Sequence, residues 1–101
     1  MGGNGSLMIA ARNPHLYKSV SAFAPISSPS NPLSGFASEA IPRYFANNPE
    51  AAKLYDCSEV IRNAKVIPNG LIDIGTHDEF MKWLQPQLLI DALGEAGHKN
   101  V

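Results

Sequence analysis

The chain has 101 residues, enough for one small domain, and its eight basic and nine acidic residues give a formal net charge of −1. This balance provides no basic surface for nucleic acid or for an acidic membrane. A single cysteine, Cys57, excludes an internal disulfide and agrees with a reducing compartment. No apolar run approaches the roughly 20 residues of a membrane span, and no signal peptide is recognisable, so we expect a soluble, cytoplasmic protein.

The first half of the chain predicts a helix, a strand and then a loop. Good helix formers after Gly5 predict a helix that ends near Asn13. Residues 17–24 predict a short strand, which Pro25 stops because proline cannot donate to a ladder. Residues 25–35 are rich in Ser, Pro and Asn, a composition typical of an irregular and flexible loop.

The middle of the chain predicts short helices, and a second strand comes after them. Residues 36–63 predict helices broken at Pro42 and at Asn48-Pro49, with Ser58 and its neighbours as candidate caps for the last one. Residues 70–74 then form a short apolar run that predicts a strand.

The last part of the chain predicts one more helix. Pro86 stands at its expected start and Gly97 at its expected end. Between them an apolar stripe recurs at helical spacing. Asn100-Val101 looks like the opening of another strand.

The alternation of strands and helices predicts an α/β fold, with a parallel sheet covered by helices on both faces. A sheet has about five or six strands on average, and this chain supplies only two complete ones. We therefore expect residues 1–101 to be a fragment of a single α/β domain, incomplete at both ends.

The stretch Leu71-Ile72-Asp73-Ile74-Gly75-Thr76-His77-Asp78-Glu79-Phe80 is the most informative of the chain. Its apolar run breaks at a glycine, and a carboxylate comes three residues later. Ligands and catalytic groups collect at the carboxyl ends of parallel strands, so Asp78 is the first candidate for a catalytic acid.

The amino-terminal stretch Met1-Gly2-Gly3-Asn4-Gly5 matches the residues after the serine of a G-x-S-x-G nucleophile elbow. Small residues are needed there because the strand-to-helix turn is tight. Together with Lys18-Ser19-Val20-Ser21-Ala22-Phe23-Ala24-Pro25-Ile26 and the Asp78 stretch, it makes the chain closely resemble the S-formylglutathione hydrolase family, also called esterase D.

The resemblance implies part of an α/β-hydrolase fold, from just after the elbow serine to before the catalytic histidine. Family members use a Ser-Asp-His triad, with no metal or organic cofactor, to cleave the small-molecule thioester S-formylglutathione to glutathione and formate. Asp78 matches the triad acid, and the backbone N–H of Met1 matches an oxyanion-hole donor. Ser27 stands where the family commonly has a cysteine. The resemblance leaves open whether the protein forms a homo-oligomer.

Several other side chains are weaker candidates. Asp73 rivals Asp78 but sits within the strand. His98 lies before the next predicted strand, at the far end of a strand that rises roughly 17 Å, and is expected in a surface loop. His15 and His77 lack the spacing of metal ligands. Cys57 has no evident base nearby and is expected to be a small buried residue.

Three further interpretations compete with catalysis. Phe80 and Trp83 could line a substrate cleft, although we expect them to cover the core. The first six residues also fit the pattern for N-myristoylation, without the basic patch that a single acyl chain needs for stable anchoring. Finally, the chain could act as a non-catalytic binding or decoy module derived from the hydrolase fold.

Overall fold

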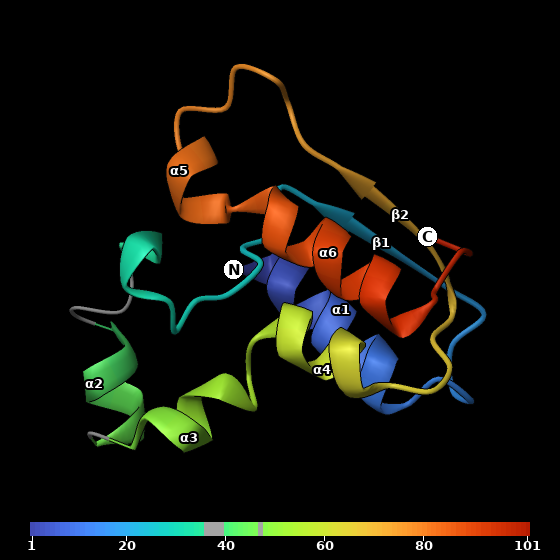
Figure 1. The fold of residues 1–101 in the computed structure, drawn as a ribbon, viewed down its shortest axis with the longest axis horizontal. Coiled ribbons are helices and arrows are strands. Elements are labelled where there is room, and N and C mark those ends of the chain that lie inside the picture. Colours follow the sequence, from blue (N-terminus) through green and yellow to red (C-terminus); the bar gives the residue numbers. More distant parts are fainter. Residues whose placement is uncertain (36–39, 47) are drawn as a thin grey trace.

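The computed structural model describes residues 1–35, 40–46 and 48–101. The elements succeed one another as α1 (Gly2–Arg12), β1 (Ser19–Phe23), the 3₁₀ helix η1 (Pro32–Ser34), α2 (Ala40–Phe45), α3 (Pro49–Lys53), α4 (Cys57–Asn63), β2 (Asn69–Asp73), α5 (Met81–Leu84) and α6 (Pro86–Ala96) (Figure 1). None of these helices is long and apolar enough to cross a membrane within the described part of the chain.

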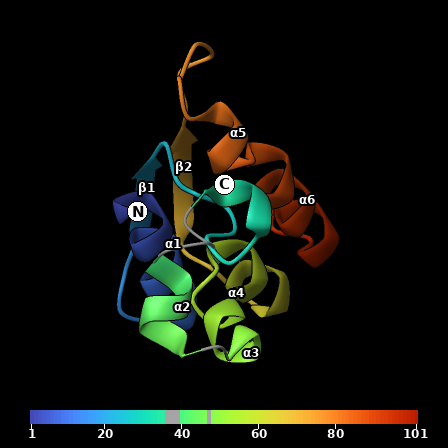
Figure 2. The same ribbon diagram turned by 90° about the vertical axis from the view of Figure 1, so that its left-hand side faces the viewer.

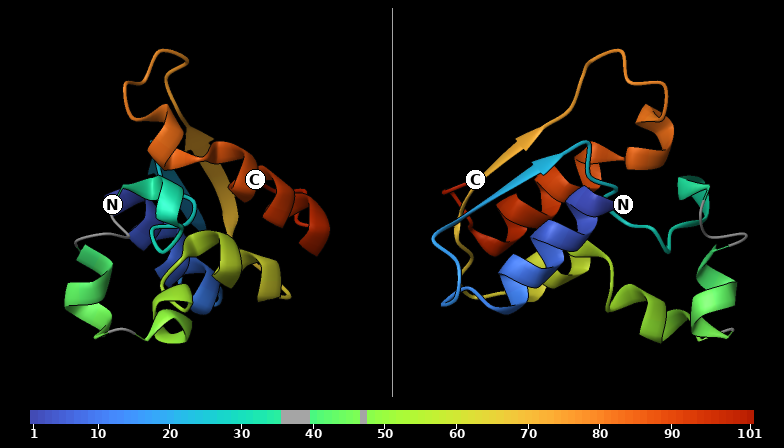
Figure 3. Two further views of the ribbon diagram at one scale, coloured as in Figure 1. Left: turned by 60° about the vertical axis from the view of Figure 1, so that its left-hand side comes forward. Right: turned by 180° about the vertical axis from the view of Figure 1, so that it is seen from behind.

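The two strands form a parallel pair in which Ser19 lies opposite Asn69 and Phe23 lies opposite Asp73. Helices α1, α4 and α6 all pack on one face of this pair, as both views of Figure 3 show. On the other face Phe23 and Leu71 are 66% and 56% exposed. The parallel α/β arrangement is confirmed. Cover on both faces is expected of a complete sheet and stays a prediction, because the described residues supply two strands and helices on one side of them.

The core lies between the helices and the covered face of the sheet. Its buried members are Leu7, Ala11, Ala22, Cys57, Ile61, Ile67, Leu89 and Ala92. The strands supply only the small Ala22 to this buried set, so most of the apolar contact is between helices. Arg62 on α4 also forms ion pairs with Glu59, at 2.6 Å, and with Glu95 on α6, at 2.7 Å.

The end of the chain lies beside the start of β2. The N–H of Gly70 donates to the carbonyl of Asn100 at 2.9 Å. Alternate residues of a strand point their backbone groups to opposite sides, so this bond lies on the edge of β2 away from β1. Residues 98–101 form no strand, although Nδ2 of Asn100 also donates to the carbonyl of Ile67 at 3.0 Å and to Oδ1 of Asn69 at 3.2 Å.

The boundaries of the first and last helices result from local chemistry. Helix α6 begins at Pro86 and ends before Gly97, whose φ of 74° is left-handed, so both predicted signals are confirmed. Helix α1 ends at Arg12 as predicted but begins at Gly2, before the predicted start. Of the three glycines in α1, Gly3 is the one that lies against the turn after β1.

Gly3 is the point of closest approach between α1 and that turn. A Cβ atom at this position would lie 2.9 Å from the Cα of Pro25, whereas a Cβ at Gly5 would meet nothing within 4 Å. Both glycines lie in the same helix and carry the same helix-propensity cost of about 1 kcal/mol relative to alanine.

We expect Gly3→Ala to lower the free energy of unfolding relative to Gly5→Ala by about 1–3 kcal/mol, the usual cost of overpacking. Gly5→Ala alone should stabilise the protein, because it removes the propensity cost without a clash. Urea unfolding of the two variants measures the difference. Equal unfolding free energies would show that α1 does not depend on the missing side chain of Gly3.

Two predictions for the middle of the chain are tested by the structure, and residues 36–39 and 47 of that stretch lie outside the described residues. Pro42 does not break a helix: it is the third residue of α2, in the first turn, where its missing N–H is not needed. The break at Asn48-Pro49 is confirmed, since Asn48 caps α3 by accepting a hydrogen bond from the N–H of Ala51 at 3.2 Å.

Ser58 is not a cap. Asp56 occupies the N-cap position of α4, and Ser58 is the second residue of that helix. The buried Ser58 donates its N–H to the carbonyl of Ser27 at 3.1 Å. This backbone contact joins the first turn of α4 to the loop after β1.

Candidate active site

A hollow of about 320 Å³ opens where the carboxyl ends of both strands meet the start of α1. Its lining consists of Met1, Ala24, Ile26, Asp78, Phe80, Trp83 and Leu84. These residues come from three segments, which are the amino-terminal end of α1, the turn after β1, and the loop and short helix after β2 (Figure 2). The structure thus brings the two candidate site residues from sequence, Met1 and Asp78, to one cavity.

Asp78 is half-buried and held by its own loop. Its Oδ1 accepts a hydrogen bond from the N–H of Phe80 at 2.8 Å. Its backbone N–H donates to the carbonyl of Gly75 at 3.1 Å, and its carbonyl accepts from the N–H of Met81 at 3.2 Å. Aspartate commonly closes such a turn by bonding the backbone two residues on. Within the described residues, Oδ2 has no hydrogen-bond partner.

Asp73, the rival acid, lies elsewhere. Its residue ends β2 on the uncovered face of the sheet, where its side chain is exposed. Its carbonyl accepts from the N–H of Ala24 at 2.8 Å, which continues the ladder between the strands. Asp73 does not line the hollow, so the geometry favours Asp78 as the acid of this site.

Met1 lies at the amino-terminal end of α1 and is 57% exposed. Its carbonyl accepts from the N–H of Gly5 at 3.0 Å, which fixes the first turn of the helix. The amino-terminal end of a helix carries a partial positive charge, so it attracts an anion that lies close to it on the helix axis. The position suits a group that stabilises negative charge.

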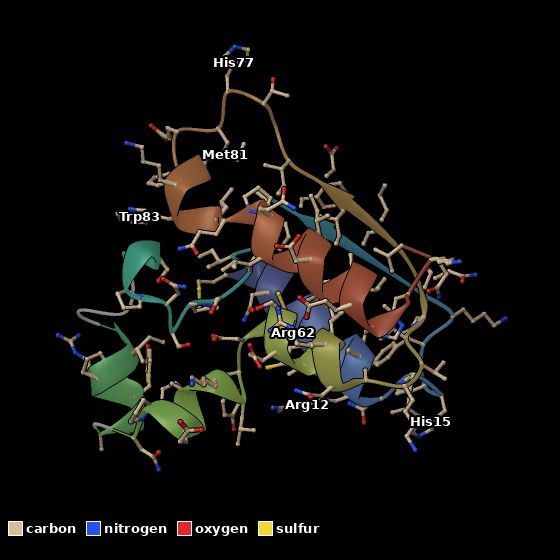
Figure 4. All side chains as sticks on the ribbon, in the orientation of Figure 1. Arg12, His15, Arg62, His77, Met81 and Trp83 are labelled. Carbon is tan, nitrogen blue, oxygen red and sulfur yellow. The ribbon has the colours of Figure 1, made fainter. Side chains whose placement is uncertain are left out.

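Phe80 and Trp83 form the aromatic wall of the hollow. Their ring centroids are 5.4 Å apart, and the side chains are 49% and 39% exposed. Gly35, with a φ of +75°, leaves room for the indole, because a Cβ atom there would lie 2.4 Å from Trp83. The expectation that both rings cover the core is wrong, since a one-turn α5 presents them to the hollow (Figure 4 labels Trp83).

The structure reveals a buried polar cluster that the sequence did not predict. Asp56 is 1% exposed and accepts hydrogen bonds from the hydroxyl of Ser28 at 2.7 Å, from the N–H of Ser30 at 3.1 Å and from the Ser30 hydroxyl. Ser28 and Ser30, which belong to the stretch 25–35, are thus bonded to a buried carboxylate. The predicted flexibility of this stretch stays a prediction. A serine-rich loop and, later in the chain, an isolated aspartate were the only signal in the sequence.

No hydrogen bond joins any of the three histidines to the carboxylate of Asp78 within the described residues. His15 and His77 are exposed at opposite ends of the molecule (Figure 4), and Nδ1 of His77 lies 3.1 Å from Oγ1 of its neighbour Thr76. His98 lies in the irregular segment after α6, as expected, but it is half-buried there, with Nε2 3.2 Å from the carbonyl of Ile61. Its ring bridges α4 and the end of α6.

Cys57 is fully buried, as predicted. Burial raises the pKa of its thiol to about 12, with a further increase from the neighbouring Asp56 carboxylate. The thiol is therefore protonated at neutral pH and cannot serve as a nucleophile. Among the described residues, no group of three His, Cys, Asp or Glu side chains could hold a metal ion.

Comparison with known proteins identifies the family. Residues 1–98 match the model of the Esterase family, described as "Putative esterase". The chain belongs to this esterase family. It is also 38% identical, over 95 residues, to the S-formylglutathione hydrolase of Paracoccus denitrificans (strain Pd 1222), an alignment that covers 94% of this chain. The resemblance drawn from the sequence is confirmed.

Family membership agrees with the parallel α/β arrangement. Esterases of this family have an α/β-hydrolase-like fold, and β1, β2 and their helices form part of one. The chain spans about one third of the length of the Paracoccus relative, since the alignment covers 33% of that protein.

Proposed function

We propose that this chain forms the acid and oxyanion half of a serine esterase site. The observation that carries the proposal is that Met1 and Asp78, which are far apart in the sequence, line the same hollow. In this proposal the nucleophilic serine directly precedes Met1, and the catalytic histidine comes after Val101. Residues 1–101 are then the fragment of the hydrolase domain between those two groups.

The backbone N–H of Met1 acts as one donor of the oxyanion hole. When a serine precedes Met1, its backbone nitrogen belongs to a peptide group, and the positive end of the α1 dipole lies behind it. As the serine attacks the substrate carbonyl, the oxygen becomes negative and the N–H stabilises it. Removing one such donor costs about 10²–10³-fold in kcat in enzymes of this kind.

Asp78 orients and stabilises the histidine. The bond between its Oδ1 and the N–H of Phe80 fixes the carboxylate, and Oδ2 is left to accept the Nδ1–H of the imidazole. The histidine then takes the proton of the serine and passes it to the leaving group, while Asp78 stabilises the imidazolium.

We propose S-formylglutathione as the substrate, by analogy with the name of the Paracoccus relative. The serine oxygen bonds to the formyl carbon, the C–S bond breaks, and glutathione leaves as its thiol. Water then hydrolyses the formyl ester to formate and restores the serine. No metal or organic cofactor takes part. We propose that this reaction serves the catabolism of formaldehyde adducts and that the enzyme is cytoplasmic.

A completed esterase tests the proposal. Residues 1–101 replace the matching segment of the Paracoccus S-formylglutathione hydrolase, and hydrolysis of S-formylglutathione is compared with that of the isolated chain. We expect turnover by the completed esterase and none above background by residues 1–101 alone, because they hold neither the elbow serine nor the catalytic histidine of this proposal. A folded but inactive completed esterase would contradict the proposal and favour a non-catalytic binding module.

A further inference from the structure

Asp56 is a buried carboxylate that forms no ion pair among the described residues. Burying an unpaired charge is costly unless hydrogen bonds replace its hydration. Ser28 and Ser30 supply such hydrogen bonds to both oxygens of this carboxylate. Asp56 therefore fixes the conformation of a segment that comes directly after β1.

That segment joins the walls of the hollow. The N–H of Ser27 donates to the carbonyl of Leu84 at 2.9 Å, and Leu84 lines the hollow at the end of α5. The carbonyl of Ser27 accepts from the N–H of Ser58 on α4. Two residues earlier, Pro25 packs against Gly3 of α1. A shift of this segment would therefore move α1 and α5 relative to each other.

Asn4 connects the first turn of α1 to the same place. Its side chain is 5% exposed; Oδ1 accepts from the N–H of Cys57 at 2.8 Å, and Nδ2 donates to the carbonyl of Tyr55 at 3.0 Å. The amide thus holds the backbone on both sides of Asp56. Because Asn4 comes three residues after Met1, this contact also fixes the end of α1 that faces the hollow.

We propose that Asp56 and Asn4 are positioning residues of the esterase site. They hold the amino-terminal end of α1 in a fixed position relative to the turn after β1 and to α5, which also line the hollow. Neither residue touches the substrate in this role. The inference rests on the proposed function, because the group that they position is the N–H of Met1. A displacement of about 1 Å in an active site can cost 10²-fold in rate.

The test compares Asp56→Ala and Asn4→Ala in the completed esterase, well below the midpoint of thermal unfolding. A fluorophosphonate that labels the nucleophilic serine counts the intact sites. We expect kcat per labelled site to fall by about 10²-fold with KM little changed, because the transition-state contact is displaced. Asp91→Ala is the matched control, since Asp91 is an exposed acid of α6 whose side chain bonds to Gln87 of the same helix. It should leave kcat unchanged.

Milder variants keep the inference testable if Asp56→Ala does not fold. Ser28→Ala and Ser30→Ala each remove a hydroxyl donor to Asp56 and should lower kcat by smaller factors, whereas Asp56→Asn, which keeps an acceptor, should recover part of the loss. If these variants lower only the unfolding midpoint and leave kcat per labelled site unchanged, Asp56 is a structural residue and the inference is wrong.

Amide hydrogen exchange separates this inference from the proposed function. Asp56→Ala should speed exchange at the N–H groups of Ser27 and Ser58 relative to Asp91→Ala, whether or not the protein turns over substrate. If Asp56→Ala speeds this exchange but the completed esterase without the substitution is inactive, only the proposed function is contradicted. Unchanged exchange in an active esterase would overturn the positioning role alone.

Discussion

Replacing Asp78 by Asn in the completed esterase should lower kcat by up to about 10⁴-fold and leave the fold intact. The asparagine can still accept the hydrogen bond from the N–H of Phe80, so the loop keeps its shape. It cannot stabilise the imidazolium, and its NH₂ group favours the wrong tautomer of the histidine. Steady-state kinetics with S-formylglutathione, together with circular dichroism as the check on folding, measure the effect.

Asp73→Asn is the matched control for this prediction. Both acids belong to β2 or to the loop after it, and the same substitution is made, but Asp73 lies on the uncovered face of the sheet and outside the hollow. Its replacement should change kcat much less. Equal losses in the two variants, or a larger loss for Asp73→Asn, would show that the acid is assigned to the wrong residue.

The isolated chain should self-associate through the uncovered face of its sheet. Phe23 and Leu71 are exposed there. Leu71 also lines, together with Leu93 and Val101, an apolar hollow of about 390 Å³ between β2 and α6. Contiguous apolar surface and unpaired strand edges promote association. We expect strong binding of a hydrophobic dye and concentration-dependent sedimentation, both reduced by the double variant Phe23→Ser and Leu71→Thr.

Leu16→Ser is the control for the self-association experiment. Leu16 is 64% exposed, close to the 66% of Phe23, but it lies in the turn after α1 rather than on the sheet. Its replacement should leave dye binding and sedimentation unchanged. A wild-type chain that is a monodisperse monomer, with a cooperative thermal transition and protected strand amides, would contradict the prediction and favour an independent binding module.

Elements set by local chemistry were predictable from the sequence. Strand β1 lies within the predicted residues 17–24, β2 begins and ends one residue before its prediction, and α6 has its predicted proline start and glycine end. Helix α5 was not predicted. It is separate from α6 because Gln85 is left-handed, with a φ of 47°, and a residue before proline avoids the helical region.

The sequence pointed only to those candidate site residues whose neighbours in the chain mark them. Asp78 could be found because it comes after a strand and a glycine, and Met1 because of the glycines after it. Asp56 could not be found, because its partners Ser28 and Ser30 precede it by 28 and 26 residues and meet it only in the folded structure. For Phe80 and Trp83 the sequence offered a substrate cleft as the alternative but favoured the core, because aromatic residues at helical spacing are more often part of a core.

Mapping the residue that a fluorophosphonate modifies in the completed esterase tests the central claim most directly. The account predicts one labelled serine, directly before Met1, because the N–H of Met1 and the carboxylate of Asp78 both belong to the hollow around it. Peptide mass spectrometry of the labelled protein identifies the site. A label on a serine within residues 1–101, such as Ser27 or Ser6, or an active enzyme that takes up no label, would contradict the account.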